Sequence, residues 1–300
     1  MSKKTLTRRN ALALGAMGAA ALAVRTAAGS QPGGSLMPKR MPTAFVPHAG
    51  GPVGHVDMGL PRTEVDPIVS YWRSLRDLPG TTPRAVLAVS AHWEARIPTV
   101  MSSPSPPMLY DYGGFPAEAY QIAWPAPGDP ALAGRVRELL AGAGFETAED
   151  PRRGFDHGTF VPLKMTYPAN VPVVQLSLKV GLDAAEHLGI GRALTPLRDE
   201  GVFIVGSGDS FHNMHGFTQA YRERSVAFNA WLADAVAAEG SERDRKLADW
   251  TSAPFARDCH PREDHLIPLM VAAGAAAEDV GRLSWRGSFF GTEQVGFHFG

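Results

Sequence analysis

Three of the ten histidines in this 300-residue chain follow short apolar runs, at positions where a buried strand would end. They are His48, His92 and His212, which come after the runs at residues 41–47, 85–90 and 201–205. Neutral imidazole is the commonest protein ligand for a metal ion. A lone histidine after a strand is more often a hydrogen-bonded loop residue, but three such cases in one chain favour a shared metal site.

A fourth candidate ligand is His265, which is expected in the first turn of a helix that continues through Met270. The positive end of a helix disfavours imidazolium and keeps the ring neutral, as a metal ligand must be. His260 is a weaker candidate because it precedes Pro261 and is expected in a loop.

His157 has the surroundings of a proton-transfer group. It lies between Gly154 and Gly158, in a segment suited to a cleft, where a general acid or base must change its charge near neutral pH. The competing interpretation is structural, with His157 capping a helix that starts near Thr159. The local pattern favours neither interpretation.

The kind of metal follows from the available ligands. A single cysteine, Cys259, excludes a thiolate-rich site, and histidine-rich sites without thiolate suit Zn(II) or Fe(II). Two histidines and one carboxylate would form the usual non-haem Fe(II) triad. The carboxylate candidates are Glu94, Glu263 and Asp264, and their spacing does not distinguish this triad from a three-histidine site.

The elements that must position these histidines alternate between strand and helix from residue 41 to residue 300. This pattern predicts a single-domain, three-layer α/β/α sandwich with a mostly parallel or mixed central sheet. Ligands of such sheets bind beyond the carboxyl ends of the strands. Strands are expected at residues 41–47, 85–90, 97–102, 171–178 and 202–205, with weaker strand character from Leu283 onward. Helices are expected at about residues 61–76, 132–140 and 184–199, and around Trp231 and Met270.

The stretch from residue 104 to residue 130 is rich in proline and aromatic side chains. A long loop in a compact domain is usually functional or disordered. Two interpretations stay open: the aromatic side chains form one wall of a site for a flat ligand, or the loop only packs on its own aromatic side chains.

Residues 1–29 resemble a twin-arginine export signal. Arg8 and Arg9 precede an apolar run at residues 11–24 and a stretch of small residues that suits cleavage, and a Gly/Pro/Ser-rich linker follows at residues 30–40. This predicts export by the twin-arginine machinery to the periplasm. The competing interpretation is an uncleaved signal that anchors the protein.

Neither a stable membrane insertion nor a nucleic-acid partner is expected. The apolar run near the N-terminus is shorter than the about 20 residues that a spanning helix needs. The formal net charge of the chain is −1, which gives no basic surface for nucleic acid.

Several segments, in order along residues 41–300, are similar to the motifs of one enzyme family. The clearest is Val89-Ser-Ala-His-Trp-Glu94; the others are Tyr110-Asp-Tyr-Gly-Gly-Phe-Pro116, Trp124-Pro-Ala-Pro-Gly128, Gly154-Phe-Asp-His-Gly158, Val173-Val-Gln-Leu-Ser177, Gly206-Ser-Gly-Asp-Ser-Phe-His-Asn213 and Glu263-Asp-His-Leu-Ile-Pro-Leu269. The chain thus resembles the class III extradiol ring-cleavage dioxygenases, in particular the 4,5-DOPA extradiol dioxygenase subgroup of the superfamily typified by the catalytic subunit of protocatechuate 4,5-dioxygenase.

The resemblance implies a role for each histidine of the predicted site. His48, His92 and His265 match metal ligands, His157 matches an acid/base histidine near the substrate, and His212 matches a histidine that is either a fourth ligand or an acid/base group. The implied partners are a catechol and O2, and the implied metal is Fe(II), because Zn(II) is redox-inert.

Two other functions remain open from the residues alone. They are a zinc-dependent hydrolase that uses a histidine-bound water, and a non-enzymatic protein that binds a metal or ligand on the same scaffold. Basic residues that could anchor a substrate carboxylate include Arg96, Arg153 and Lys164, and the sequence does not choose among them.

Overall fold

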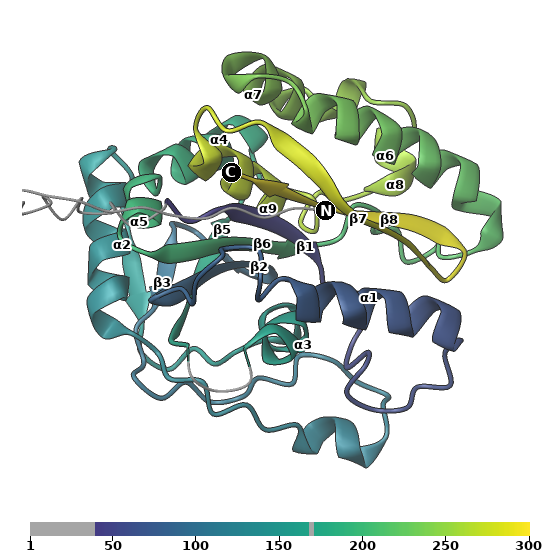
Figure 1. The fold of residues 1–300 in the computed structure, drawn as a ribbon, viewed down its shortest axis with the longest axis horizontal. Helices are drawn as coiled ribbons and strands as arrows, with labels where there is room; N and C mark the ends of the chain where they lie inside the picture. The colour runs from purple at the N-terminus through teal and green to yellow at the C-terminus, as the bar shows by residue number, and fades with distance from the viewer. Residues whose placement is uncertain (1–39, 168–170) are drawn as a thin grey trace, which may run out of the picture. The chain divides into compact units, whose positions relative to one another are not determined.

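An eight-stranded mixed sheet runs through the computed structural model, which describes residues 40–167 and 171–300 (Figure 1). The predicted signal at residues 1–29 and the linker up to residue 39 lie outside the described residues. The strands are β1 (Thr43–Pro47), β2 (Ala85–Ala95), β3 (Thr99–Met101), β4 (Ala148–Asp150), β5 (Val173–Lys179), β6 (Val202–Gly208), β7 (Gly281–Phe289) and β8 (Thr292–Phe299).

The strands follow the order β4-β3-β5-β2-β6-β1-β8-β7 across the sheet. The four central strands, β5, β2, β6 and β1, are parallel to their neighbours within this group, while β3 is antiparallel to β5 and β8 is antiparallel to β1. Because β1, β2 and β6 are parallel and adjacent, their carboxyl ends meet at one edge of the sheet.

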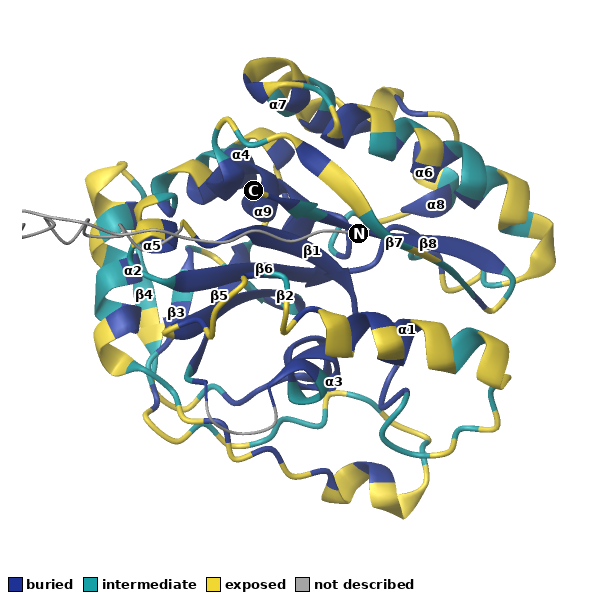
Figure 2. Ribbon diagram, in the orientation of Figure 1, coloured by how far each residue is buried: buried dark blue, intermediate teal, exposed yellow. Residues whose placement is uncertain are grey.

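Both faces of the central strands are buried, which explains why their sequences are continuous apolar runs. Along β2, Leu87 and Val89 belong to the core on one face, and Val86 and Ala88 belong to the core on the other. Burying each Val or Leu side chain of this kind contributes about 1.5–3 kcal/mol. Figure 2 shows the central strands as buried along their length, while exposed residues gather on the outer faces of the helices.

Helices cover both faces of the sheet. The α-helices are α1 (Arg62–Ser74), α2 (Pro130–Gly142), α3 (His157–Thr166), α4 (Ala184–Ala193), α5 (Pro196–Asp199), α6 (Arg222–Val236), α7 (Gly240–Ala248), α8 (Ala256–Cys259) and α9 (Ile267–Ala276). Short 3-10 turns occur at Ala117–Gln121, Gln219–Tyr221 and Trp250–Ser252. Side chains of α1 and α3 belong to the core on one face, and those of α2 and α4–α9 belong to the core on the other (Figure 1). The predicted three-layer α/β/α sandwich is therefore confirmed.

Three details differ from the sequence prediction. The helix expected at residues 184–199 is two helices, α4 and α5, because Pro196 lacks an N–H and so cannot continue the hydrogen bonding of α4. The weak strand character after Leu283 corresponds to a β7–β8 hairpin that extends the sheet beyond β1. The prediction of His265 in the first turn of a helix is wrong, since α9 begins at Ile267 and His265 lies in the turn before it.

In the two described ranges, no helix is both long enough and apolar enough to cross a membrane. The most apolar helix is α9, and every one of its residues is buried. It is short, and it packs against the sheet in the core formed by α4, α6 and β6.

The turn before α9 lies directly against the backbone of β6. A Cβ atom on Gly206 would lie 2.2 Å from the carbonyl oxygen of Pro268, and one on Gly208 would lie 2.0 Å from the carbonyl oxygen of His265. Real Cβ atoms do not approach oxygen so closely, and the atoms they would meet belong to the backbone. Glycine at these positions therefore allows His265 to lie over the end of β6.

We expect Gly208→Ala to destabilise the protein by about 3 kcal/mol, because the added methyl group overpacks a buried contact. The same methyl group would displace His265 and so lower the affinity of the protein for a divalent metal. Urea unfolding and metal titration measure the two effects.

The matched control is Gly134→Ala in α2, where a Cβ atom meets nothing within 4 Å. Alanine favours a helix interior by up to about 1 kcal/mol over glycine, so this variant should be as stable as the parent or more stable. Equal stability of the two variants would contradict the argument from close packing.

Candidate metal centre

Strand geometry brings His48 and His92 to the same edge of the sheet. His48 directly follows β1, and its N–H continues the pairing by donating to the carbonyl of Gly208 at the end of β6 (3.1 Å). His92 lies within β2, which extends beyond the predicted strand at residues 85–90 to Ala95. The pairing of β2 with β5 shifts register between Val89 and Glu94, and such a bulge re-aims the side chains within it.

The imidazole Nε2 atoms of three histidines converge. Nε2 of His92 lies 3.1 Å from Nε2 of His48 and 3.2 Å from Nε2 of His265. Two nitrogen ligands at about 2.1 Å from one ion and at right angles to each other would lie about 3.0 Å apart. The two distances that join His92 to His48 and to His265 therefore match the separation of ligands on one shared metal ion.

The other ring nitrogen of His48 fixes the tautomer that a ligand needs. Ser207 Oγ donates its proton to the carbonyl of Gly158, so it must accept from Nδ1 of His48, which lies 3.1 Å away. Nε2 of His48 then carries a lone pair toward the shared position. A hydrogen bond at the distal nitrogen is the usual support of a metal-bound histidine.

The other two rings have carboxylates at their distal nitrogens. Asp264 Oδ2 lies 3.2 Å from Nδ1 of His265, although the two are not aligned as a hydrogen bond, and Asp111 Oδ2 lies 3.4 Å from Nδ1 of His92. Carboxylates at this position make an imidazole a stronger electron donor toward a metal.

The protonation states suit metal binding. Burial, followed by the repulsion of neighbouring imidazoles, holds the pKa values of His48 and His265 well below their ordinary value. Burial and the neighbouring His157 lower the pKa of His92 to about 4, against the opposing effect of nearby carboxylates. All three rings are therefore neutral at pH 7, as metal ligands must be.

Asp209 is a fourth possible ligand that the sequence analysis did not single out. Its Oδ2 lies 3.7 Å from Nε2 of His48, and His48, Asp209 and His265 could together hold an ion. Its side chain is buried, which raises the pKa of this carboxyl well above the ordinary value despite a hydrogen bond from the backbone N–H of Ala49. The three histidines are more closely spaced, so their set fits a metal best.

None of the three carboxylates proposed from the sequence places an oxygen atom among the three converging Nε2 atoms as a further ligand. Glu94 pairs with Arg262 at 2.7 Å, and Glu263 pairs with Arg257 at 2.6 Å. Asp264 lies behind His265 and groups with His212 instead. A sequence cannot show which side of a ligand a neighbouring carboxylate occupies, because that depends on the turn before α9.

His212 stacks on His265 with ring centroids 3.4 Å apart and planes 11° from parallel. Burial lowers the pKa of His212 below its ordinary value, against the opposing charge of Asp264. Its nitrogen lies within reach of atoms of Asp264 and His265 but is not part of the His48 and His92 grouping. His212 thus lines the cavity beside the three converging histidines.

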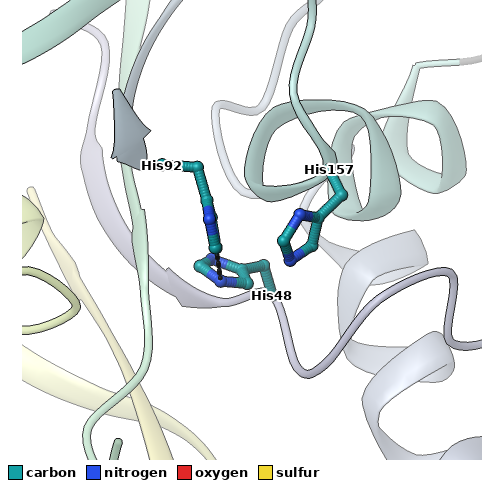
Figure 3. A group of neighbouring side chains, drawn as sticks. All are labelled: His48, His92 and His157. Atoms are coloured by element: carbon teal, nitrogen blue, oxygen red, sulfur yellow. Dashed lines mark hydrogen bonds between the residues drawn. The ribbon is translucent and has the colours of Figure 1, made fainter. Parts of the chain in front are cut away.

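His157 lies beside His48 and His92, on the first turn of α3 (Figure 3). Its ring centroid is 3.9 Å from that of His92, and His48, His92 and His157 are close enough to share one ion. The helix begins at His157 rather than near Thr159, and its N-cap is Asp156, which accepts from the N–H of Thr159. The interpretation of His157 as the cap is therefore wrong, because the adjacent aspartate caps the helix.

Asp156 ties the elements around this site together. Its buried carboxylate accepts from Ser90 Oγ of β2 at 2.7 Å, from Arg153 at 2.6 Å, and from the side-chain amide of Gln175 in β5. Together with the N-cap bond, these contacts fix the start of α3 against the sheet, and so fix where His157 lies relative to His92.

Asp111 holds the ring of His157 in place. One of its oxygens, Oδ1, accepts from the backbone N–H of His157 and from Nδ1, each at 2.9 Å. Burial opposes ionisation of Asp111, but the hydrogen bonds and charge of His157 outweigh it, and the pKa of Asp111 is lower than its ordinary value. The hydrogen bond at Nδ1 leaves Nε2 of His157 as the ring nitrogen available for proton transfer.

Asp111 comes from the aromatic loop at residues 104–130, and both interpretations of that loop hold in part. Tyr110, Tyr112 and Tyr120 pack on one another, with ring centroids 5.6–6.2 Å apart. Phe115, by contrast, lines the cavity that contains the histidines. The only sequence signal for Asp111 was its place in the Tyr110-Asp-Tyr-Gly-Gly-Phe motif, and its partner lies 46 residues away.

The weaker candidate ligand, His260, lies outside this group. His260 is buried and contacts the carbonyl of Ser210 through Nε2 at 3.0 Å, and burial lowers its pKa to about 3. His260 therefore has a structural role in this part of the core and is not part of the metal site.

A cavity of about 410 Å³ opens over the converging nitrogens. His48, His92, His157, His212 and His265 all line it. Cavities of this size bind small molecules, and one wall of this cavity can coordinate a metal and transfer protons.

The fold and this site define a metal-dependent α/β enzyme whose histidines act at the carboxyl ends of parallel strands. Residues 42–299 match the family described as the catalytic LigB subunit of aromatic ring-opening dioxygenase. The chain belongs to this family and is a class III extradiol dioxygenase, an oxidoreductase that opens catechol-type rings with O2.

Similar proteins cover most of the chain. A 4,5-DOPA dioxygenase extradiol of Beta vulgaris is 40% identical over 242 residues, which are 79% of this chain and 87% of that protein. A protein of the same name from Escherichia coli K12 is 36% identical over 244 residues, 79% of this chain and 85% of that protein.

A solved structure agrees with these matches. The crystal structure of an uncharacterized protein from Escherichia coli K12 matches with a TM-score of 0.70 and 28% identity, and the match covers 87% of this chain and 100% of that one. The predicted family, enzyme class and fold are therefore confirmed, and the hydrolase and the non-enzymatic binding protein are not favoured.

We expect Asp111→Asn to lower kcat about 10–100-fold, less than the about 10²–10⁴-fold that general acid–base catalysis contributes in full, because His157 itself remains. The amide can still accept from His157, so the ring stays in place, but the charge that stabilises a protonated ring is lost. Steady-state oxygen uptake at saturating Fe(II) measures the effect, and KM should change much less than kcat. An equal loss in Asp111→Glu, which keeps the charge, would contradict this role.

Proposed function

We propose that this protein is an Fe(II)-dependent extradiol dioxygenase in which His48, His92 and His265 hold the metal. The observation that carries the proposal is the convergence of three neutral Nε2 atoms, 3.1–3.2 Å apart along two of their edges, on the floor of a ligand-sized cavity. The donor set has no thiolate and leaves positions open for a catechol and O2.

Bound Fe(II) would supply the redox chemistry that joins O2 to the ring, whereas Zn(II) in the same site would hold a catechol without oxidising it. The protein residues hold the catechol and move its protons. His157 accepts a hydroxyl proton of the catechol at Nε2, while Asp111 keeps its Nδ1–H in place and stabilises the charge that forms. The imidazole of His157 then returns a proton as the catechol ring opens.

His212 is the second candidate for proton transfer. It lines the cavity, and its stacking on His265 holds the ring beside the metal position. Its nitrogen groups with Asp264 and His265 and not with His48 and His92, which supports a role in acid–base chemistry over one as a fourth ligand. The names of the relatives make DOPA one of the first catechols to test.

The proposed function is tested by oxygen uptake of protein loaded anaerobically with Fe(II), using a panel of catechols. We expect uptake together with a yellow ring-opened product. His92→Ala should lose both metal and activity. His157→Ala should retain the metal and lose turnover by about 10²-fold or more, because only the proton-transfer group is removed.

Zn(II)-loaded protein is the matched control and should bind catechol without consuming oxygen. Activity that Zn(II) supports in the absence of oxygen would overturn the proposal in favour of a hydrolase. Full activity of His157→Ala would exclude the assigned proton-transfer role.

Residues 1–29 are proposed to direct export to the periplasm through the twin-arginine machinery. The support is the sequence pattern of Arg8-Arg9, the apolar run and the small residues that follow. The paired change Arg8→Lys and Arg9→Lys keeps the charge and should leave the protein in the cytoplasm, since the signal depends on the arginine pair. Cell fractionation and N-terminal sequencing measure the result.

The outcome also separates the two interpretations of this segment. A periplasmic protein that begins near residue 30 supports a cleaved signal. A membrane-bound protein with an intact N-terminus would instead show an anchor, and unchanged export of the Lys-Lys variant would exclude the twin-arginine route.

A further inference from the structure

The cavity over the metal site is lined by two chemically different sets of side chains. One set is the histidines. The other set, the apolar wall, consists of large apolar side chains, namely Met58, Phe115, Met214, Phe217, Phe289 and Phe290. Phe290 packs against two others of this set, with ring centroids 4.6 Å from Phe289 and 6.0 Å from Phe217.

Among the described residues that line this cavity, none is Lys or Arg. Besides the histidines, the side chains with polar groups there are Asp209 and Gln294. The amide of Gln294 is already used, because its oxygen accepts from the N–H groups of Ser210 and Phe211 and its nitrogen donates to the carbonyl of Phe211. Neither side chain offers a cation for a substrate carboxylate.

The basic residues that the sequence suggested as carboxylate anchors are elsewhere. None of Arg96, Arg153 and Lys164 lines the cavity. Arg153 donates to the buried carboxylate of Asp156 at 2.6 Å and lies over the ring of Trp93, 4.8 Å from its centroid. Its guanidinium therefore stabilises the structure around Asp156 and Trp93 and does not bind a ligand in the cavity.

A second cavity of about 570 Å³ is lined by two basic groups, Arg62 and Arg73. It shares Met58 with the metal-site cavity. Its lining also includes Asp57 and Asp66, and Arg62 lies 3.6 Å from Asp66. Acidic and basic side chains are thus equal in number in this pocket, and neither arginine lines the metal-site cavity.

The metal-site cavity is large enough for a substrate bigger than an unsubstituted catechol. Its volume of about 410 Å³ equals about fourteen times the share of one water molecule in the liquid. A catechol, with six carbons and two oxygens, leaves part of this space free. The free part adjoins the apolar wall, because the diol must face the histidines.

We propose that the preferred substrate is a catechol that carries an uncharged, apolar ring substituent, which packs against the wall formed by Phe115, Phe217, Phe289 and Phe290. This inference rests on the proposed function and narrows its substrate class. The amino-acid side chain of DOPA would place a carboxylate and an ammonium group against this wall without a partner for the carboxylate. Leaving a charge unpaired against an apolar surface is unfavourable, whereas an apolar group gains from burial.

The test compares catechols that differ only in charge. We expect kcat/KM of the Fe(II) enzyme for the methyl ester of 3-(3,4-dihydroxyphenyl)propanoate to exceed that for the free acid by about 10–100-fold, as an unpaired buried charge predicts. 4-Propylcatechol should behave like the ester, and DOPA like the acid. Equal or better turnover of the acid or of DOPA would overturn the inference and leave the proposed function intact.

A binding measurement keeps the test independent of turnover. Zn(II)-loaded protein cannot oxidise the substrate, so the shift in its melting temperature reports binding alone. The ester should raise the melting temperature more than the acid at equal concentration. If no catechol is turned over, the proposed function fails, and this comparison still decides the inference: a shift for the acid that matches or exceeds that for the ester would overturn it.

A variant at the rim of the wall provides a gain-of-function test. Met214 lines the cavity and is 73% exposed, so a longer charged side chain has room there. Met214→Lys should shift the ratio of kcat/KM for acid over ester by about two- to fivefold toward the acid, within the range of a partly exposed ion pair. Met214→Gln is the neutral control and should leave the ratio unchanged; an equal shift in both variants would contradict the argument from charge.

Discussion

The close approach of three neutral imidazoles is the constraint on which the rest of this structure depends. The Nε2 atoms of His48, His92 and His265 lie within a little over 3 Å of one another along two edges, and two of the rings are almost fully buried. At this distance two imidazole nitrogens need a shared proton or cation between them, because two facing lone pairs repel. The surrounding framework must therefore hold the three rings against a cost that metal binding removes.

Three sets of contacts hold these histidines in place. The parallel pairing of β1, β6 and β2 sets the spacing of His48 and His92, and the close contact of β6 with the turn before α9 sets His265. The buried carboxylate of Asp156 then joins β2, β5 and the start of α3, which carries His157. Each ligand or proton-transfer group thus comes from a different element, and none depends on a free loop for its backbone position.

The same cavity separates polar chemistry from substrate selection. Histidines and Asp209 form the polar part of its lining, where a metal and a diol would meet, while aromatic rings and methionines form the apolar part. An apolar wall excludes water from the reacting groups and strengthens electrostatic interactions on the floor. It also favours the binding of substrates with uncharged substituents. The same surface therefore contributes both to catalysis and to substrate selectivity.

The sequence by itself determined the fold class, the family and the four histidines closest to the metal position, because buried parallel strands leave continuous apolar runs and ordered motifs are specific to a family. Apolar periodicity also gave most helices and strands, with errors at Pro196 and at the start of α9. Only the tertiary structure decided which carboxylates matter. It placed Glu94 in an ion pair with Arg262, and it brought Asp111 to His157 and Asp209 to His48 from segments 46 and more than 150 residues away. The physical reason is that these contacts depend on how loops cross the edge of the sheet, and neither residue spacing nor local propensity encodes that path.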